Sequence, residues 1–328
     1  MSATLGIKKL HLWMCAEELP ASVQLGGSAA QSSTDFQRPK LSTSLDVNAL
    51  SYCRFSLLPL ADNALVALPK LIDSTSADVW ALPSGERVHA AIGQAGKTSI
   101  LNSNPNPEER SKAGIFMALH LYSIACDGSS SPELRLLCGY ESGGATLRRF
   151  AQKHKVISIE GTGWEVIWDA KLHVESIMAM RVSPKNDFAL TISADHIVRK
   201  YDLTILHPLT LTWDTKAEGC VAHRTKHPGN GTIAIREDGR VCAVGGWDGS
   251  IRLYATHTTK SLGTLKYHKT QCQAVEFAQD QADATEDAEE DEDEGMGSVE
   301  KAERARWLVG GGKDNRVSIW SLITFNKN

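Results

Sequence analysis

The chain has 328 residues, of which 42% are hydrophobic and 23% are charged, and its formal net charge is −4. This balance is ordinary for a soluble globular protein, and no run approaches the ~18–20 apolar residues that a membrane helix needs. The charge is uneven: ten of the fifteen residues from Asp280 to Glu294 are acidic, which leaves 35 basic against 29 acidic residues elsewhere. We therefore expect a mildly basic body that carries one acidic loop.

The seven cysteines are scattered along the chain, and none belongs to a Cys-x-x-Cys pair. An odd, dispersed set argues against a disulfide framework and against a zinc ribbon, and it fits a reducing compartment. The N-terminus has Lys8 and Lys9 inside a short apolar stretch and lacks the order of a signal peptide. The sequence therefore predicts a soluble intracellular protein.

The first predicted element is a short strand at residues 10–13, which looks like the third strand of a repeat whose first two strands are absent. Two explanations stay open: the chain begins inside a repeat, or this strand joins the last repeat and closes a ring. Residues 16–43 are rich in Ser, Gln, Gly and Pro and predict a long surface loop, and residues 102–111, with two prolines, predict another.

The repeat units that follow match the pattern weakly near the N-terminus and clearly towards the C-terminus. Alternating apolar residues bounded by turn residues predict strands at 47–55, 64–68, 78–80, 86–91, 115–124, 134–137, 145–150, 177–182, 188–192, 197–201, 232–236, 241–244, 251–254, 262–267, 274–277, 307–309 and 317–320. Four short strands joined by tight turns make one blade of a β-propeller. Residues 278–303 carry the acidic stretch and predict a disordered insertion within the last blade. The chain thus reads as one domain, residues 1–328, with five recognisable blades and a partial N-terminal repeat.

A histidine, an aspartate and an aromatic residue recur in the last three units, as His173, Asp195 and Tyr201, as His227, Asp248 and Tyr254, and as His268, Asp314 and Trp320. The aspartate follows the histidine by 22, 21 and 46 residues, and the aromatic residue follows six later each time. Without the acidic insertion, the third spacing matches the other two. A unit of ~40–50 residues with this pattern is typical of an all-β propeller.

These His–Asp pairs allow two interpretations. Both residue types ligate metals and move protons, but one pair per blade places the pairs around a ring rather than in one cluster. The favoured interpretation is structural: each aspartate caps the turn before the third strand and hydrogen-bonds the histidine of its own blade. Buried polar groups without such partners cost ~1–3 kcal/mol each. The sequence predicts no catalytic residue, no cofactor and no metal.

Other motifs are weaker. Residues 91–98 loosely match a phosphate-binding loop, but the first glycine is alanine, and two following prolines preclude the helix that such a loop needs. The Trp-Asp dipeptides at 168–169 and 213–214 fit outer strands or their turns. The basic spots are dispersed, so no direct contact with nucleic acid is predicted. The acidic run is interpreted as a solvated loop, with contact to a basic partner as the alternative.

Several segments resemble a known family. The stretches GGWDGSIRLY (245–254) and GGKDNRVSIWSL (311–322) look like WD-repeat blades, and four further segments narrow the match: LDVNALSYC (45–53), residues 72–84, GYESGG (139–144), and HPG (227–229) followed by IREDGR (235–240). In this order they resemble the fungal ASTRA-associated protein family, whose animal relatives are described as G-protein-β-like WD proteins. The resemblance runs from about Leu5 to Leu322.

The resemblance implies a nuclear, non-catalytic scaffold subunit of the ASTRA complex, possessing no small-molecule substrate and no membrane contact. It further implies a link to chromatin remodelling and to the co-chaperones that mature phosphatidylinositol-3-kinase-related kinases. Members form propellers of about seven blades, so one or two blades' worth of sequence is expected to be missing at the N-terminus. A G-protein β-like signalling adaptor and a propeller enzyme with its site in the central funnel are the alternatives.

Overall fold

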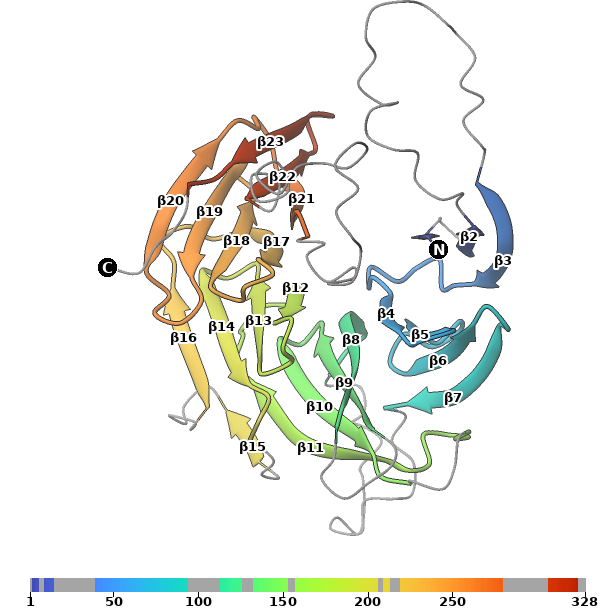
Figure 1. The fold of residues 1–328 in the computed structure, drawn as a ribbon. Helices are drawn as coiled ribbons and strands as arrows, with labels where there is room; N and C mark the ends of the chain where they lie inside the picture. Colours follow the sequence, from blue (N-terminus) through green and yellow to red (C-terminus); the bar gives the residue numbers. More distant parts are fainter. Residues whose placement is uncertain are drawn as a thin grey trace, which may run out of the picture.

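The computed structural model describes residues 2–5, 9–14, 39–93, 113–125, 132–152, 157–205, 209–212, 219–279 and 306–323. All regular elements in these residues are β-strands, and they form six sheets. Figure 1 shows the sheets side by side around a central space, which the strands β4, β8, β12, β17 and β21 face. The fold is a β-propeller, as the repeats predicted.

The sheets follow one another in chain order. The first holds β1 (Ser2–Leu5), β2 (Lys9–Met14) and β3 (Lys40–Asp46), and the second holds β4 (Ser56–Pro59), β5 (Ala64–Pro69), β6 (Ala77–Leu82) and β7 (Glu86–Ile92). The third holds β8 (Phe116–Ile124), β9 (Glu133–Tyr140), β10 (Gly144–Phe150) and β11 (Trp164–Lys171), with β15 (Leu209–Thr212) added parallel to β11. All other pairings are antiparallel within these three sheets.

The last three sheets carry the clearest repeats. The fourth holds β12 (Ile177–Val182), β13 (Phe188–Ser193), β14 (Ile197–Asp202) and β16 (Cys220–Arg224). The fifth holds β17 (Asn230–Ile235), β18 (Val241–Gly246), β19 (Ser250–Ala255) and β20 (Ser261–Lys266). The sixth holds β21 (Cys272–Phe277), β22 (Trp307–Gly312) and β23 (Val317–Ser321). Each predicted strand from residue 177 onwards corresponds to one of these elements.

The N-terminal repeat differs from the expectation. β2 is preceded by β1 and followed by β3 in one antiparallel sheet, so one of the two strands thought absent is present. β2 does not join β21–β22–β23, which rules out the closing role in the described residues. β3 starts at Lys40, so the predicted loop at 16–43 ends sooner, and residues 15–38 lie outside the described part of the chain.

The segment 47–55 was predicted as a strand, and this prediction was wrong. It is a loop stabilised by side-chain-to-backbone bonds: the amide of Leu50 donates to the Oδ1 of Asn48 at 3.0 Å, and that of Cys53 donates to the Oγ of Ser51 at 3.2 Å. Asn and Ser compete in this way with a strand ladder. The first strand of this blade is instead β4, directly after the loop.

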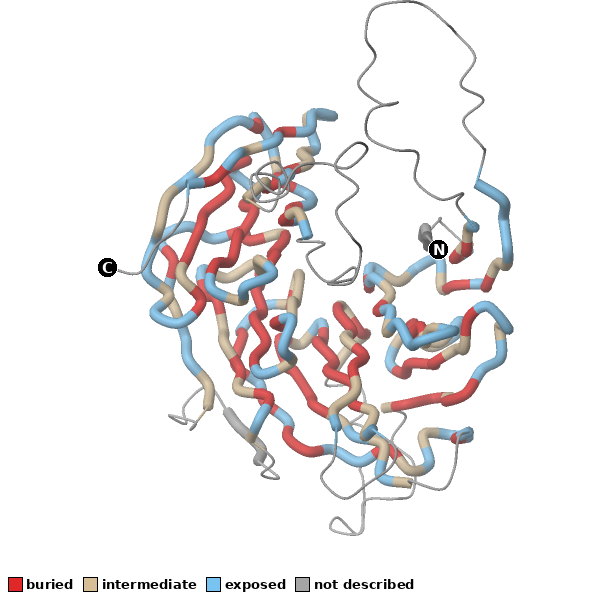
Figure 2. Tube along the Cα trace, in the orientation of Figure 1, coloured by how far each residue is buried: buried red, intermediate tan, exposed pale blue. Residues whose placement is uncertain are grey.

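The core lies between neighbouring sheets. Figure 2 shows that burial is greatest in middle strands such as β13, β18 and β19, and that outer strands such as β16 and β20 are much more exposed. All six residues of β13 and of β18 are buried, and both strands are largely apolar, with Thr191 and Ser193 of β13 as the polar exceptions. Phe188 and Leu190 of β13, for example, pack in one cluster with Val244 and Tyr254 of the next sheet. Each blade is therefore stabilised by its neighbours, as in other repeat folds.

The predicted insertion at 278–303 is described only at Ala278 and Gln279, which are not in a strand; the remainder lies outside the described residues, as do 102–111 and most of the phosphate-loop-like motif. Among the described residues, none forms a helix that could span a bilayer.

Candidate functional site

The first His–Asp pair lies at the start of the fourth sheet. The Nδ1 of His173 donates to the Oδ2 of Asp195 at 2.9 Å, and its Nε2 lies 2.8 Å from the hydroxyl of Thr191. The same aspartate caps its turn, because its Oδ1 accepts from the amide of Ile197 at 2.9 Å. Burial by itself raises the pKa of Asp195, but the bonds from His173 and from backbone amides hold it below its usual value. Tyr201 is buried and stacks on Trp168.

The last pair has the same form. The Nδ1 of His268 donates to Asp314 at 3.0 Å, and its Nε2 lies 3.0 Å from the hydroxyl of Ser318. Asp314 also accepts from the amides of Lys269 and Arg316, at 3.1 and 3.3 Å. The indole of Trp320 donates to the Ser318 hydroxyl at 3.1 Å, which links the aromatic residue to the pair. Every polar atom of this histidine ring therefore has a partner inside one blade.

The middle pair does not form, which corrects the expectation for His227. His227 is exposed, while Asp248 pairs with the guanidinium of Arg252, whose Nη1 donates at 3.2 Å, and still caps its turn through the amide of Ser250 at 3.1 Å. Tyr254 is buried, as Tyr201 is in the preceding blade, whereas Trp320 is only partly buried. A sequence signal exists in hindsight. Thr191 lies four residues before Asp195, Ser318 lies four residues after Asp314, and each supplies the hydroxyl that bonds the second ring nitrogen of the histidine. The two corresponding positions around Asp248 hold Val244 and Arg252, which have no hydroxyl.

The turns that carry these residues form one continuous loop face. The amide of His173 donates to the carbonyl of Gly143 at 3.2 Å, and the amide of Trp247 donates to that of Gly229 at 2.7 Å. Asn230 connects the fourth and fifth sheets, because its side chain donates to the carbonyl of Asp195 at 3.2 Å. Backbone amides and the Asn230 side chain thus connect the turns of neighbouring blades. A rigid set of surface loops on such a scaffold is the usual place for binding residues.

Large apolar side chains project from the same loop face. Over the second sheet, Leu50, Tyr52 and Ile72 are 85%, 82% and 89% exposed. Their two loops are joined by Asn48, whose amide donates to the Ser74 hydroxyl at 2.8 Å and to the Lys70 carbonyl at 3.3 Å. We call Leu50, Tyr52, Leu71 and Ile72 the apolar loop patch. A contiguous apolar patch on a surface is typical of a protein contact site.

Comparison with known proteins agrees with the repeats. Residues 220–255 match the family model described as "WD domain, G-beta repeat". These residues form a WD repeat, and the fold is that of a WD-repeat β-propeller. The chain is 28% identical to ASTRA-associated protein 1 of Verticillium alfalfae over 96% of this chain and 75% of that one, and 26% identical to ASTRA-associated protein 1 of Penicillium rubens over 87% and 72%. The resemblance to the ASTRA-associated proteins is confirmed.

The chain also resembles an animal protein and a solved structure. The WD-repeat protein is 25% identical to the mouse guanine nucleotide-binding protein subunit beta-like protein 1, over 87% of this chain and 68% of that one. Among solved structures, the computationally designed Ika8 protein aligns over 81% of this chain and 57% of the designed one, with a TM-score of 0.44 and 13% identity. At that score the second likeness adds nothing to the fold described above.

Polar side chains of this WD-repeat protein do converge from several blades towards the centre. Arg181 on β12 donates to the carbonyl of Ile233 on β17 at 3.2 Å and forms an ion pair with Glu276 on β21. Arg54, just before β4, donates to the carbonyl of Gln273 at 3.3 Å. The arginines are thus engaged in linking inner strands to one another. No group of three or more His, Cys, Asp or Glu side chains that could hold a metal occurs in the described part of the chain.

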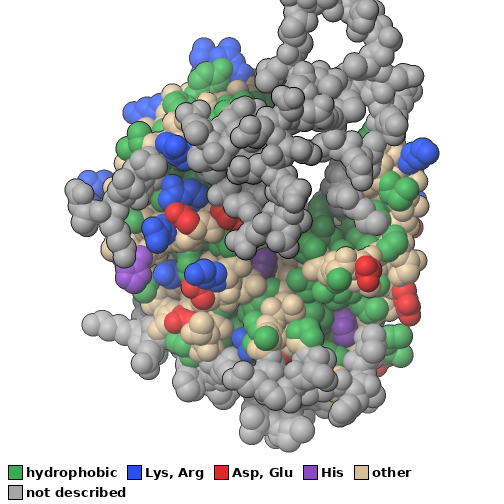
Figure 3. All heavy atoms as spheres, in the orientation of Figure 1, with side chains coloured by type: hydrophobic (Ala, Val, Ile, Leu, Met, Phe, Trp, Pro, Cys, Tyr) green, Lys and Arg blue, Asp and Glu red, His purple; other side chains and the backbone are tan. Residues whose placement is uncertain are grey.

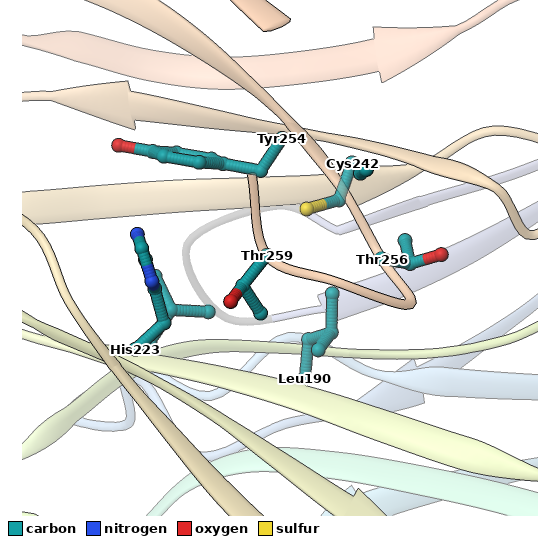
Figure 4. A pocket seen from close by; sticks show the side chains of 8 residues that line it. Leu190, His223, Cys242, Tyr254, Thr256 and Thr259 are labelled. Carbon is teal, nitrogen blue, oxygen red and sulfur yellow. The ribbon is translucent and has the colours of Figure 1, made fainter. Parts of the chain in front are cut away.

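One small cavity lies between the fourth and fifth sheets (Figure 4). It has an empty volume of about 230 Å³, part of it open to solvent, and its lining includes His223 and Tyr254, whose rings meet edge-on with centroids 5.4 Å apart. Cys242 also lines it, and burial raises the pKa of this thiol to about 12, so it is not a nucleophile at neutral pH. Small-molecule sites usually have ~300–1,000 Å³. The cavity is a packing gap between blades.

The charges are distributed unevenly over the molecule. On the side seen in Figure 3, Lys and Arg side chains gather mainly over the left half, where Figure 1 draws the sheets from β12 to β20, while hydrophobic side chains are prominent near β4. On this side the cationic side chains are therefore concentrated over these sheets. The two parts of the surface offer different chemistry to partners.

Proposed function

We propose that this WD-repeat protein is a non-catalytic scaffold subunit of an ASTRA-type complex, and that it acts in the nucleus. In this role it supports chromatin remodelling and the maturation of phosphatidylinositol-3-kinase-related kinases. The names of the fungal relatives support the association with ASTRA. The observation that carries the scaffold role is the apolar loop patch, in which Tyr52 and Ile72 are more than four-fifths exposed on loops that Asn48 holds together.

The physical reason is the cost of leaving such side chains in water. Burying one large apolar side chain is worth ~1.5–3 kcal/mol, so burying a patch of four offsets the entropy that is lost when a partner surface becomes ordered. Buried aromatic and aliphatic anchors dominate the energetics of protein interfaces. The loops need no rearrangement to bind, because side-chain and backbone bonds already hold them.

The test is affinity purification of the tagged full chain from nuclear and cytosolic extracts, followed by mass spectrometry. The wild-type chain is expected to recover ASTRA subunits and kinase-maturation co-chaperones from the nuclear extract. The double variant Tyr52→Ser/Ile72→Ser is expected to lose them. The matched control is Ile159→Ser/Val221→Ser, which removes two apolar side chains that are 69% and 53% exposed on an outer segment and an outer strand. Equal recovery with both double variants contradicts the assigned surface.

The alternative is a G-protein β-like signalling adaptor, which the mouse relative favours by its name. G-protein β subunits hold a small γ subunit through an N-terminal coiled coil, and residues 1–43 contain no heptad pattern. Stable recovery of a small γ-like protein at equal stoichiometry, without ASTRA subunits, would favour the adaptor over the scaffold.

A further inference from the structure

A second surface lies on the same loop face but over the fifth and sixth sheets. Its basic members are Lys226, Lys269, Lys313 and Arg316, all exposed, and its aromatic members are Trp247 and Tyr267, which are 46% and 48% exposed. We call these six residues the basic loop patch. They come from four loops: the one before β17, the one between β18 and β19, the one before β21, and the one between β22 and β23.

Contacts between the backbones make these loops neighbours. The amide of Trp247 donates to the Gly229 carbonyl at 2.7 Å, which joins the loop of Lys226 to that of Trp247. The amide of Lys313 donates to the Gln271 carbonyl at 2.8 Å, and the amide of Lys269 donates to Asp314 at 3.1 Å. The two pairs of loops also meet, because a Cβ at Gly249 would overlap the carbonyl oxygen of His268 and lie 2.7 Å from that of Thr270. The patch is thus continuous across the fifth and sixth sheets.

The acidic side chains among these loops are already engaged. Asp248 forms an ion pair with Arg252, and Asp314 accepts from His268 and from two backbone amides. No ion pair with a described carboxylate joins any of the four basic residues. A cluster of unpaired cations produces a positive potential that attracts an oppositely charged partner.

Trp247 gives this surface a fixed apolar platform. A Cβ at Gly229 would lie 2.8 Å from the nearest ring atom of the indole, and one at Gly231 would lie 3.3 Å from it, so the ring lies directly against this stretch of backbone. Gly229 has a φ of +80°, a conformation that glycine adopts without cost. One side of the indole therefore rests on protein, and nearly half of its surface stays available to a partner.

We propose that the basic loop patch is the docking site for an acidic segment of a partner protein, with aspartates and glutamates beside the four cations and an apolar side chain against Trp247. The half-exposed carboxylate of Asp248, next to Trp247, favours a peptide over a nucleic acid. The neutral backbone of a peptide can donate an amide to that carboxylate, whereas the backbone of a DNA strand carries a charge at every phosphate and has no donor. The proposal does not depend on which complex the protein belongs to.

The test is direct binding to the full chain, measured by fluorescence anisotropy. The probe is a short labelled peptide of Asp and Glu residues with Leu at its centre, compared with an Asn/Gln version of the same peptide and with single-stranded oligothymidylate. The acidic peptide is expected to bind, and its affinity is expected to fall with added salt because exposed charges are screened. Lys269→Glu/Lys313→Glu is expected to weaken binding by about tenfold or more.

The control variant makes the same charge change at the other end of the fifth sheet. Arg240→Glu/Lys260→Glu alters exposed residues of the turns before β18 and before β20, which are joined by the bond from the Thr256 amide to the Arg240 carbonyl at 2.9 Å. Thermal melts establish that both double variants fold. Loss of binding in the first variant alone supports the proposal. Equal loss in both, no binding of the acidic peptide by the wild type, or tighter binding of oligothymidylate overturns it.

Discussion

Arg252 holds Asp248 in the fifth sheet, in the role that a histidine has in the sheets on either side. Its Nη1 lies 3.2 Å from the Oδ1 of the aspartate, and the guanidinium is 7% exposed while the carboxylate is 49% exposed. In all three of these blades the aspartate caps its turn in the same way, because its Oδ1 accepts a hydrogen bond from the backbone amide two residues further on. The turn therefore fixes the position of the carboxylate, and the donor opposite it is interchangeable between an imidazole and a guanidinium.

Replacing Asp248 by Ala should lower the free energy of unfolding by about 2 kcal/mol, because it leaves a buried guanidinium without its carboxylate. The double variant Asp248→Ala/Arg252→Met should be destabilised by less than the sum of the two single variants. Urea denaturation of the four proteins measures this coupling. Additive changes would show that the pair contributes nothing beyond its separate parts.

His268 and His227 occupy equivalent positions in the repeat, but their contributions to stability should differ. His268→Ala removes a buried ring bonded to Asp314 and Ser318, and it should cost about 2 kcal/mol. His227→Ala removes an exposed ring and should change stability by no more than about 0.5 kcal/mol. Chemical denaturation of both variants in parallel checks the difference. Similar losses would mean that His227 has a contact that this structure does not contain.

Two glycines in the fifth sheet should respond very differently to alanine. Gly249 has a φ of +78°, and a Cβ there would overlap the His268 carbonyl oxygen and lie 2.7 Å from that of Thr270, so Gly249→Ala should cost more than about 3 kcal/mol. Gly239 has a φ of +68° with no atom within 4 Å of a Cβ, so Gly239→Ala should cost about 1 kcal/mol. Thermal unfolding of the pair separates backbone strain from steric overlap.

Acid should destabilise the protein partly through His89. Its ring is buried against Phe150 and Trp164, with Nδ1 2.9 Å from the Ser158 hydroxyl, and burial lowers its pKa from 6.5 to about 4. A base whose pKa is depressed by folding favours the native state above its unfolded pKa, so this stabilisation is lost as the pH falls from 6.5 towards 4. One linked proton changes stability by at most about 1.4 kcal/mol per pH unit.

The variant His89→Asn has no titrating group at this position and keeps a side chain that can bond to Ser158. Its stability should therefore fall less steeply than that of the wild type between pH 6.5 and 4, the window set by the pKa shift of the histidine. Denaturation midpoints across this range measure the two slopes. Parallel curves would show that the His89 proton does not couple to folding. Burial also lowers the pKa of His120 to about 4. Because His120 is present in both proteins, its contribution cancels when the two slopes are compared.

Much of the fold could be predicted from local pattern. The strands β12, β13, β14, β18, β19 and β23 occur where alternating or continuous apolar residues stand between Gly-Asp or Ser-Pro turns. The outer strands β3 and β16 were missed, because KLSTSLD and CVAHR have few apolar residues and one face in solvent. The segment 47–55 was misjudged in the opposite sense. It has apolar side chains at strand-like spacing, yet they lie on a loop from which Leu50 and Tyr52 project into solvent while Val47 and Cys53 are buried.

The sequence by itself determined the repeat, the number of clear blades and the place of each turn aspartate. These depend on side-chain alternation and on turn residues, which act over a few neighbouring positions. Only the tertiary structure decided that Asp248 pairs with Arg252, that His227 faces solvent, and that the loops of Trp247 and Lys313 share one surface. Such contacts join residues that are distant along the chain or compete for one partner, so the packing of the sheets, and not the period of the sequence, selects among them.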